Sequence, residues 1–405
     1  MYIIWHDNDY DLALWVYKNS CLKYKQGVVL RQIPKTNDEK LLTADFKDIT
    51  DYFILPFIKF ATPDILIQKI NKDGTSKILV ATELMTHTPH HDHIFQRFER
   101  IFCISKEKIP VALILPDMKT KIEKGTKTGY RPVSYKPSQL VVHLYLKTTQ
   151  INSNPTLMFF WPQKNGYLKY DEKHQTAPKI EGQILSWLDF INECIEKNGL
   201  VEIATSKVIR DQISFLEDKY PFQNGKFDPS LAFPVFIKEF PKVYKSLIRT
   251  KIVNTKLFVE KSQLNKKELP EGFLEKESTV LFEYKSKTFR TDPYAGFLCG
   301  VFNMFCMDNK GEKIHNLVHI PHGIKFSLVS HSTKKRPTFS EMFEDFNQCP
   351  MHSSPNLEKL GLENLIKHVN SKCTYTFSKQ QRIFGTLPDI IIFDDKILYN
   401  QNHGY

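Results

Sequence analysis

The chain of 405 residues is 41% hydrophobic and 25% charged, which is a globular composition, and its length is sufficient for two domains. Its seven cysteines are scattered with no CxxC pair, which argues against a disulfide framework and against a zinc ribbon. The formal net charge of +11 favours polyanionic partners, most simply nucleic acid.

Several other classes of protein lack support in the sequence. Neither a GxxxxGK[ST] phosphate loop nor a GxGxxG fingerprint occurs, which argues against an ATP-driven motor and a dinucleotide enzyme. The first residues do not form the basic and apolar segments of a signal peptide, and no apolar run approaches the roughly 18 residues of a membrane helix. We therefore expect a soluble cytoplasmic protein without a membrane partner.

The predicted elements alternate between helices and strands. Two segments with acidic starts, 7–18 and 38–53, have the apolar spacing of helices, and a hairpin around Asp73-Gly74 follows them. Further along we expect a helix over 92–107, strands over 111–115, 140–146 and 157–161, and a helix over 182–197 that Gly199 stops. The Pro- and Gly-containing segment 219–234 is the expected break between two domains.

The hairpin contains two acidic residues whose spacing is informative. If Asp73-Gly74 is a two-residue loop, residues whose numbers sum to 147 face each other, and Asp64 lies opposite Glu83. Opposed strand residues have Cβ atoms about 4.5–5.5 Å apart, so two carboxylates there repel unless a cation lies between them. Oxygen ligands favour Mg²⁺, which commonly binds one or two carboxylates and a phosphate. The pattern therefore predicts a phosphodiester substrate.

At this point the sequence resembles the PD-(D/E)XK nucleases, the superfamily that includes most restriction endonucleases. The residues that carry the resemblance are Pro63-Asp64, Glu83, a helix with Gln96, and the apolar strand 111–115. It implies a restriction-endonuclease-like α/β core, a mixed central sheet flanked by helices, within residues 1–220. A second α+β domain, residues 221–405, would serve target recognition or dimerisation.

The resemblance also implies an activity and the residues that perform it. The expected reaction is Mg²⁺-dependent, sequence-specific cleavage of double-stranded DNA, with Asp64 and Glu83 as metal ligands and a companion DNA methyltransferase in the host. The family places a Lys two residues after the Glu, where it orients the attacking water, but this chain has Met85 there. His87, on the same face if the strand continues, and Gln96, from the following helix, are the candidates for that role.

A basic segment with interleaved tyrosines follows the strand 111–115. Positive charges and aromatic rings in such an arrangement suit an arm that binds phosphates and stacks on bases or sugars. The residues expected to contact DNA are Lys121, Lys124, Lys127, Tyr130, Arg131 and Lys136.

Three alternatives stay open on sequence alone. The cluster from His87 to His93 has some features of a zinc hydrolase, although Thr88 stands where the first His of the HxHxDH motif would be. Glu283 and Lys285 have the E-x-K spacing that the first half lacks, and together with Asp389 they would form a second or permuted site. Met85 also makes a nuclease fold that binds DNA without cleaving it a credible alternative.

Overall fold

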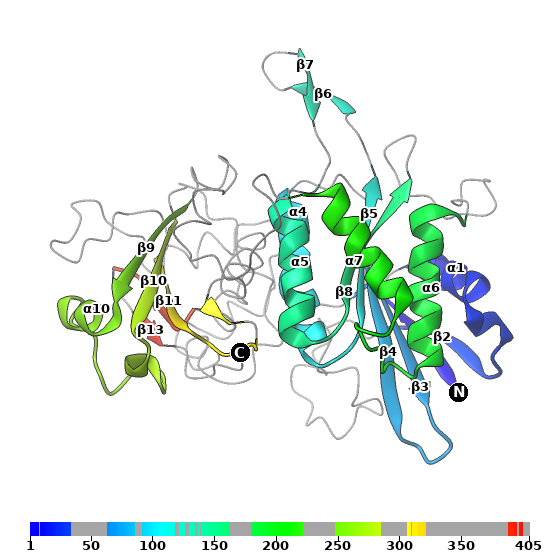
Figure 1. Ribbon diagram of the computed structural model, residues 1–405, viewed down its shortest axis with the longest axis horizontal. Helices are drawn as coiled ribbons and strands as arrows, with labels where there is room; N and C mark the ends of the chain where they lie inside the picture. The colour runs from blue at the N-terminus through cyan, green and yellow to red at the C-terminus, as the bar shows by residue number, and fades with distance from the viewer. Residues whose placement is uncertain are drawn as a thin grey trace, which may run out of the picture. The chain divides into compact units, whose positions relative to one another are not determined.

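The computed structural model divides the chain into two units, Met1–Phe227 and Asp228–Tyr405. The division falls within the segment 219–234. Each unit has a mixed sheet flanked by helices (Figure 1). The structure describes residues 1–7, 9–33, 63–85, 91–117, 121–125, 129–133, 137, 139–162, 180–221, 248–284, 306–308, 310–320, 388–394 and 397–399.

The described part of the first unit has a sheet of six strands in the order β2-β1-β3-β4-β5-β8. Strand β3 runs antiparallel to both of its neighbours, whereas β4, β5 and β8 are parallel to one another, as are β1 and β2. The strands are β1 (Tyr2–His6), β2 (Val28–Gln32), β3 (Ile65–Ile70), β4 (Ser76–Leu84), β5 (Val111–Asp117) and β8 (Thr156–Pro162).

Helices cover both faces of this sheet (Figure 1). On one face, Trp15 and Trp187 stack with ring centroids 5.5 Å apart and pack against Ile4 and Ile67 of the sheet. On the other face, Phe98 and Tyr145 meet edge to face. The helices are α1 (Tyr10–Asn19), α4 (His91–Lys106), α5 (Gln139–Asn152), α6 (Gly182–Glu196) and α7 (Lys207–Lys219), with a short 3-10 helix, η1 (Cys21–Tyr24).

Most predicted elements of the first unit are confirmed, and two need correction. The first helix begins at Tyr10, because Asp9 caps it by accepting a hydrogen bond from the Leu12 amide at 3.1 Å, and the preceding residues form β1. The predicted strand 140–146 is part of helix α5, which is buried almost all round. A short apolar run cannot distinguish a strand from a buried helix. The predicted helix 38–53 lies outside the described residues.

The hairpin β3–β4 has the predicted register at one end only. Its loop is longer than predicted: the Asn71 amide donates to the Thr75 carbonyl at 2.8 Å, and Gly74 has a φ of 82°, as in a three-residue loop. A β-bulge then inserts Leu79 as an extra residue in β4. The bulge offsets the longer loop, so Ile65 pairs with Thr82 and the sum of 147 is restored.

The second unit has a sheet in the order β13-β12-β11-β10-β9 within the described residues. Strands β9 and β10 are antiparallel, and β10, β11 and β12 are parallel, so β9-β10-β11-β12 repeats the relative directions of β3-β4-β5-β8. The elements are β9 (Ile248–Asn254), α10 (Thr255–Lys261), a 3-10 helix η4 (Phe273–Glu275), β10 (Ser278–Tyr284), β11 (His315–Ile320), β12 (Ile390–Ile392) and β13 (Ile397–Tyr399).

The end of α6 supports the bulge, and this contact can be tested. Gly199 has a φ of 70°, and a Cβ there would lie 3.1 Å from the Leu79 Cα and 3.3 Å from the Ile78 carbonyl oxygen. A non-glycine residue in the left-handed conformation costs about 1–2 kcal/mol. We expect Gly199→Ala to lower the free energy of unfolding by more than this amount, because the backbone of β4 must also move.

Thermal unfolding of the variant measures this loss. Gly182→Ala is the matched control, since Gly182 has a φ of 54° but nothing within 4 Å of its added Cβ. Equal losses in the two variants would show that the approach of Gly199 to β4 does not constrain the bulge.

Candidate active site

Asp64 and Glu83 are brought together at one end of the hairpin. Asp64 immediately precedes β3, and the neighbouring pair Ile65 and Thr82 places it opposite Glu83. The backbone amide of Leu84 donates to Asp64 Oδ2 at 2.6 Å, and the amide of Asp7, which follows β1, donates to the Asp64 carbonyl at 3.1 Å. Backbone groups of two neighbouring strands therefore fix the position of Asp64.

Glu83 is buried and ion-paired with two arginines of α4. The Glu83 residue is 1% exposed, and its Oε1 lies 3.0 Å from Arg97 Nε and 2.9 Å from Arg100 Nη1. The two arginines are three residues apart and thus lie on one face of the helix. The second oxygen, Oε2, is buried and has no hydrogen-bond partner among the described residues.

Its surroundings make Asp64 a much weaker acid than an exposed aspartate. Burial, and then the negative charge of Glu83, raise the pKa of Asp64 to about 8, although the Leu84 amide and the charges of Arg100 and Arg97 oppose the rise. Asp64 therefore holds a proton at neutral pH in the metal-free protein. A divalent cation at this position would stabilise the ionised form of both carboxylates.

The donor set fits Mg²⁺ better than a transition metal. No group of three or more His, Cys, Asp and Glu side chains that could hold a metal occurs in the part of the chain that the structure describes. Two carboxylates are too few for a structural zinc site, but they suit Mg²⁺, which retains waters and takes further oxygens from a phosphate. The uncoordinated Glu83 Oε2 and the protonated Asp64 are the atoms that such an ion would use.

The structure describes Met85, which occupies the position of the family's lysine. Met85 follows β4, is 1% exposed, and donates its amide to the Ile114 carbonyl at 2.9 Å. Gln96 belongs to α4, but its side chain lies outside the described residues, and so does the whole of His87. The remaining members of the predicted zinc cluster, through His93, also have no described side chains.

The predicted basic arm contains a separate two-stranded sheet of β6 (Lys121–Gly125) and β7 (Gly129–Val133). Its register places Lys124 opposite Tyr130 and Glu123 opposite Arg131. Lys127 and Lys136 lie outside the described residues. The described part of the predicted arm is thus an antiparallel ribbon.

The second or permuted site predicted from Glu283, Lys285 and Asp389 is not assembled among the described residues. Asp389 aligns with Leu317 of β11, which pairs with Val280 of β10, whereas Glu283 lies three residues further along β10. At about 3.3 Å per residue this is about 10 Å along the strand, in addition to two strand spacings of about 4.8 Å each. Lys285 lies outside the described residues.

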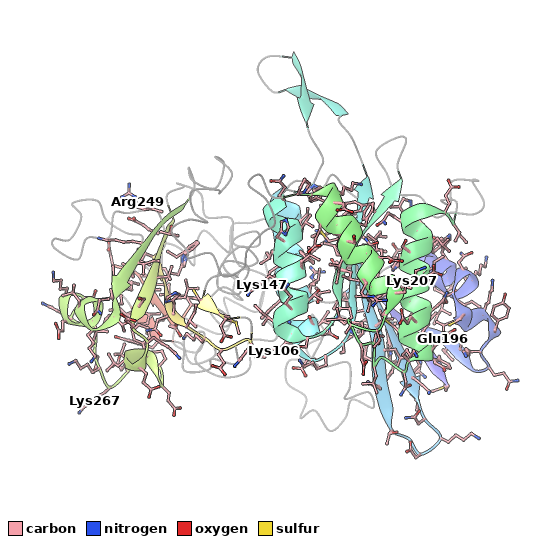
Figure 2. All side chains as sticks on the ribbon, in the orientation of Figure 1. Lys106, Lys147, Glu196, Lys207, Arg249 and Lys267 are labelled. Atoms are coloured by element: carbon pink, nitrogen blue, oxygen red, sulfur yellow. The ribbon has the colours of Figure 1, made fainter. Side chains whose placement is uncertain are left out.

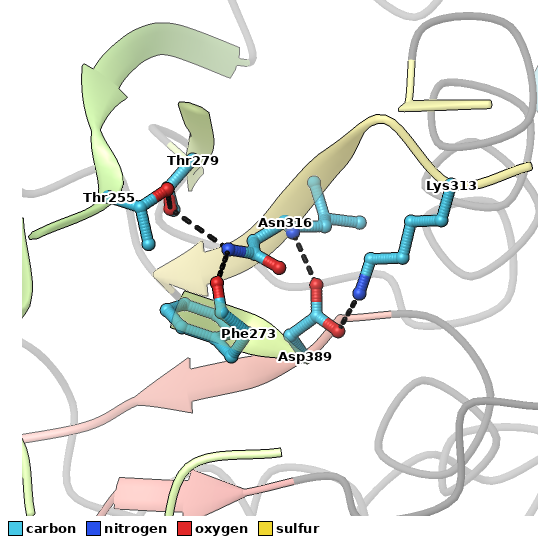
Figure 3. A network of polar contacts seen from close by, with 7 residues as sticks. Thr255, Phe273, Thr279, Lys313, Asn316 and Asp389 are labelled. Carbon is cyan, nitrogen blue, oxygen red and sulfur yellow. Dashed lines mark hydrogen bonds and ion pairs between the residues drawn. The ribbon is translucent and has the colours of Figure 1, made fainter. Parts of the chain in front are cut away.

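Asp389 has structural partners instead. It is fully buried, its Oδ2 accepts a hydrogen bond from the Leu317 amide at 2.6 Å, and its Oδ1 is ion-paired with Lys313 (Figure 3). In the same network the Asn316 side chain donates to the Phe273 carbonyl at 2.7 Å. Glu283 is ion-paired with Arg249, labelled in Figure 2, at 3.8 Å.

Arg97 and Arg100 are the site residues that the sequence analysis missed. The sequence signal for them is two arginines spaced by three in the helix that follows the strand of Glu83. Comparisons with protein-family models, with curated proteins and with solved structures found no match for this chain. Among the described residues, no helix is both long enough and apolar enough to cross a membrane.

The pKa of Asp64 leads to a pH-dependent stability. Folded Asp64 keeps its proton up to about pH 8, whereas the unfolded chain loses it near 3.8, so the free energy of unfolding of the metal-free protein should fall as pH rises across this window. Asp64→Asn should make the free energy of unfolding depend less on pH. It should also raise the unfolding midpoint at pH 8 by at least about 2–4 °C, the equivalent of about 1 kcal/mol.

Thermal unfolding at pH 5 and pH 8 without divalent ions checks this expectation. Asp73→Asn is the control, because the pKa of Asp73 in the hairpin loop is lowered by hydrogen bonds from Thr75, so its contribution lies at lower pH. An unchanged pH dependence in Asp64→Asn would mean that the folded protein does not raise the pKa of Asp64.

Proposed function

We propose that the protein is a Mg²⁺-dependent endonuclease of the restriction type that hydrolyses phosphodiester bonds of double-stranded DNA at a specific sequence. The observation that carries the proposal is the opposed pair of Asp64 and Glu83, in which burial and then the charge of Glu83 raise the pKa of Asp64. The mixed sheet flanked by helices is compatible with a restriction-endonuclease-like core, and the net charge of +11 favours DNA as the polyanion. The second unit would supply target recognition or dimerisation, and a partner methyltransferase would protect the host.

In this proposal the chain's residues hold and orient the reacting groups. Asp64 Oδ2 is held by the Leu84 amide, which leaves its other oxygen for the ion, and Glu83 Oε2 would be the second ligand. Mg²⁺, when bound, lowers the pKa of a coordinated water. Hydrolysis would form a bond from a water oxygen to phosphorus as the bond to the leaving sugar oxygen breaks, and the leaving oxygen would take up a proton, giving a phosphate monoester and a hydroxyl group. Gln96 or His87 would orient the water in place of a lysine.

One observation favours a second candidate, a DNA-binding protein of the same fold without nuclease activity. Glu83 is already neutralised by two arginines, and the following Met85 offers no proton donor or acceptor. The two candidates differ in one result, which is whether a long duplex incubated with Mg²⁺ yields discrete fragments.

Isosteric replacement of the acidic pair tests the site. We expect Asp64→Asn and Glu83→Gln each to reduce the single-turnover cleavage rate by at least about 100-fold, because each removes one charged ligand while keeping the side-chain volume. Cleavage of a long duplex with Mg²⁺ in excess measures the rates, and thermal unfolding shows that the variants are folded.

Asp389→Asn in the second unit is the matched control, since Asp389 is also a buried acid before a strand but is paired with Lys313. It should affect stability and leave the cleavage rate of the folded protein within a few-fold of the parent rate. Near-parental cleavage by either first-unit variant would remove Asp64 and Glu83 from the catalytic site.

The basic ribbon gives a separate prediction about DNA binding. Replacing Lys124, Lys127 and Arg131 with Gln should weaken binding to every duplex and reduce the slope of log K against log salt by up to about three units. The reason is that each DNA phosphate that the protein no longer contacts keeps its condensed counterion. Fluorescence anisotropy at several salt concentrations with Ca²⁺ in place of Mg²⁺ measures the slope. An unchanged slope would mean that the ribbon is a solvated surface element.

A further inference from the structure

Positive charge is concentrated on one strand of the second unit. The nine residues 248–256, which form β9 and the start of α10, contain three basic residues and no acid. The next stretch, 257–277, contains four lysines and five glutamates, so its charges nearly cancel. The three basic residues are Arg249, Lys251 and Lys256, and together they are termed the β9 stripe.

The β9 stripe follows the edge of the second sheet and faces solvent. Among the described residues, β9 is an outermost strand of that sheet. Arg249 and Lys251 are two residues apart and therefore project from the same face of the strand, and Lys256 follows in α10. All three residues are exposed, and the side chain of Arg249, labelled in Figure 2, is 45% exposed.

The charge of the stripe is only partly balanced within the chain. Glu283 of β10 lies directly opposite Arg249 and is ion-paired with it at 3.8 Å, a distance longer than a hydrogen bond. Lys251 lies opposite the apolar Leu281. Neither Lys251 nor Lys256 has an ion pair in the part of the chain that the structure describes. A positive surface therefore remains along the strand.

Protection of the sheet edge explains only part of this pattern. Lysine on an edge strand prevents pairing with strands of other molecules, and this accounts for Lys251. It does not account for Lys256, which lies on a helix. Nor does it account for the absence of acids from residues 248–256, since an acid protects an edge as well.

The arrangement of the charges indicates the shape of a ligand. Two residues along an extended strand are about 7 Å apart, and Lys256 continues the row beyond the end of β9. The cations are thus spread along a line and not gathered at one point, which suits a linear polyanion better than a single small anion. Lys and Arg that contact successive phosphates release condensed counterions, and this release favours binding.

We propose that the β9 stripe binds the phosphate backbone of a DNA duplex. This inference rests on the proposed function, because it takes DNA to be the ligand. It gives the second unit a DNA-contacting surface. Phosphate contacts fix the orientation of a protein on the duplex without reading its sequence, so the stripe contributes affinity and orientation and not specificity.

Neutralising the stripe in the full chain tests the proposal. We expect Arg249→Gln, Lys251→Gln and Lys256→Gln together to weaken duplex binding at least about 10-fold, and to reduce the slope of log K against log salt by up to about three units. The loss should be the same for duplexes of unrelated sequence, as expected of phosphate contacts. Fluorescence anisotropy in Ca²⁺ at several salt concentrations measures both quantities.

The matched control removes the same charge from the same unit. Lys261, Lys266 and Lys267 are exposed and lie outside the stripe, and Figure 2 shows Lys267 well separated from Arg249. Replacement of all three lysines with Gln should leave the slope within about one unit of the parent value. Equal losses in the two triple variants would show that DNA responds to net charge alone, and the stripe would then not be a binding surface.

A double variant keeps the test valid if the triple variant does not fold. Arg249→Gln removes an ion pair from the buried Glu283 and can destabilise the sheet. Lys251→Gln with Lys256→Gln keeps that pair and should still reduce the slope by up to about two units. An unchanged slope in this folded variant would overturn the proposal. If it aggregates while its duplex affinity is unchanged, the stripe only protects the edge of the sheet.

The results also separate failure of this inference from failure of the proposed function. A parent protein that binds and cleaves duplex, with stripe variants that bind equally well, refutes the stripe alone. A parent protein that binds duplex without cleaving it refutes the nuclease, and weaker binding by the double variant then still supports the stripe. A parent protein that binds no duplex in Ca²⁺ refutes both.

Discussion

The opposition of Asp64 and Glu83 across the β3–β4 hairpin is the constraint on which the candidate site of the first unit depends. An antiparallel hairpin brings directly opposed residues to within about 5 Å of each other. The fold therefore holds two acids at a distance at which their ionised forms repel each other. The chain compensates by protonating Asp64, by fixing it with the Leu84 amide, and by placing two arginines on Glu83. These contacts leave Glu83 Oε2 without a hydrogen-bond partner among the described residues.

The register that creates this pair was predictable only in part. The two-residue loop assumed from Asp73-Gly74 was wrong, and the opposition of Asp64 and Glu83 nevertheless holds because Leu79 is inserted as a bulge. The sequence of a bulge residue is not distinctive, since Leu79 is an ordinary apolar residue within an apolar run. What determines it is tertiary: the chain after α6 approaches β4 at Gly199, closely enough that a side chain there would meet the backbone of the bulge.

Whether the other elements could be predicted from the sequence depended on whether one face or every face of the element is buried. Helix α4 and strands β5 and β8 were predicted correctly because their apolar patterns match their burial. Residues 140–146 of helix α5 were predicted as a strand, since they form an almost continuous apolar run and the helix is buried on nearly every side, which leaves no polar face to mark a helical period. The side chain of Thr148 then bonds to the Leu144 carbonyl, at 2.9 Å, which satisfies a polar group inside this buried helix. Arg97 and Arg100 were missed for a related reason, because their role depends on which strand residue their helix faces.

The two sheets of the chain show how the same frame supports different chemistry. Glu83 and Glu283 are both the penultimate residue of a strand with one antiparallel and one parallel neighbour, and both are buried. Opposite Glu83 the chain has Asp64, whereas opposite Glu283 it has Arg249. The opposed Arg249 forms an ion pair with Glu283 across the two strands. An opposed aspartate cannot do so, and Glu83 is ion-paired with two arginines of helix α4. The residue opposite the glutamate therefore decides whether an ion pair can form within the sheet.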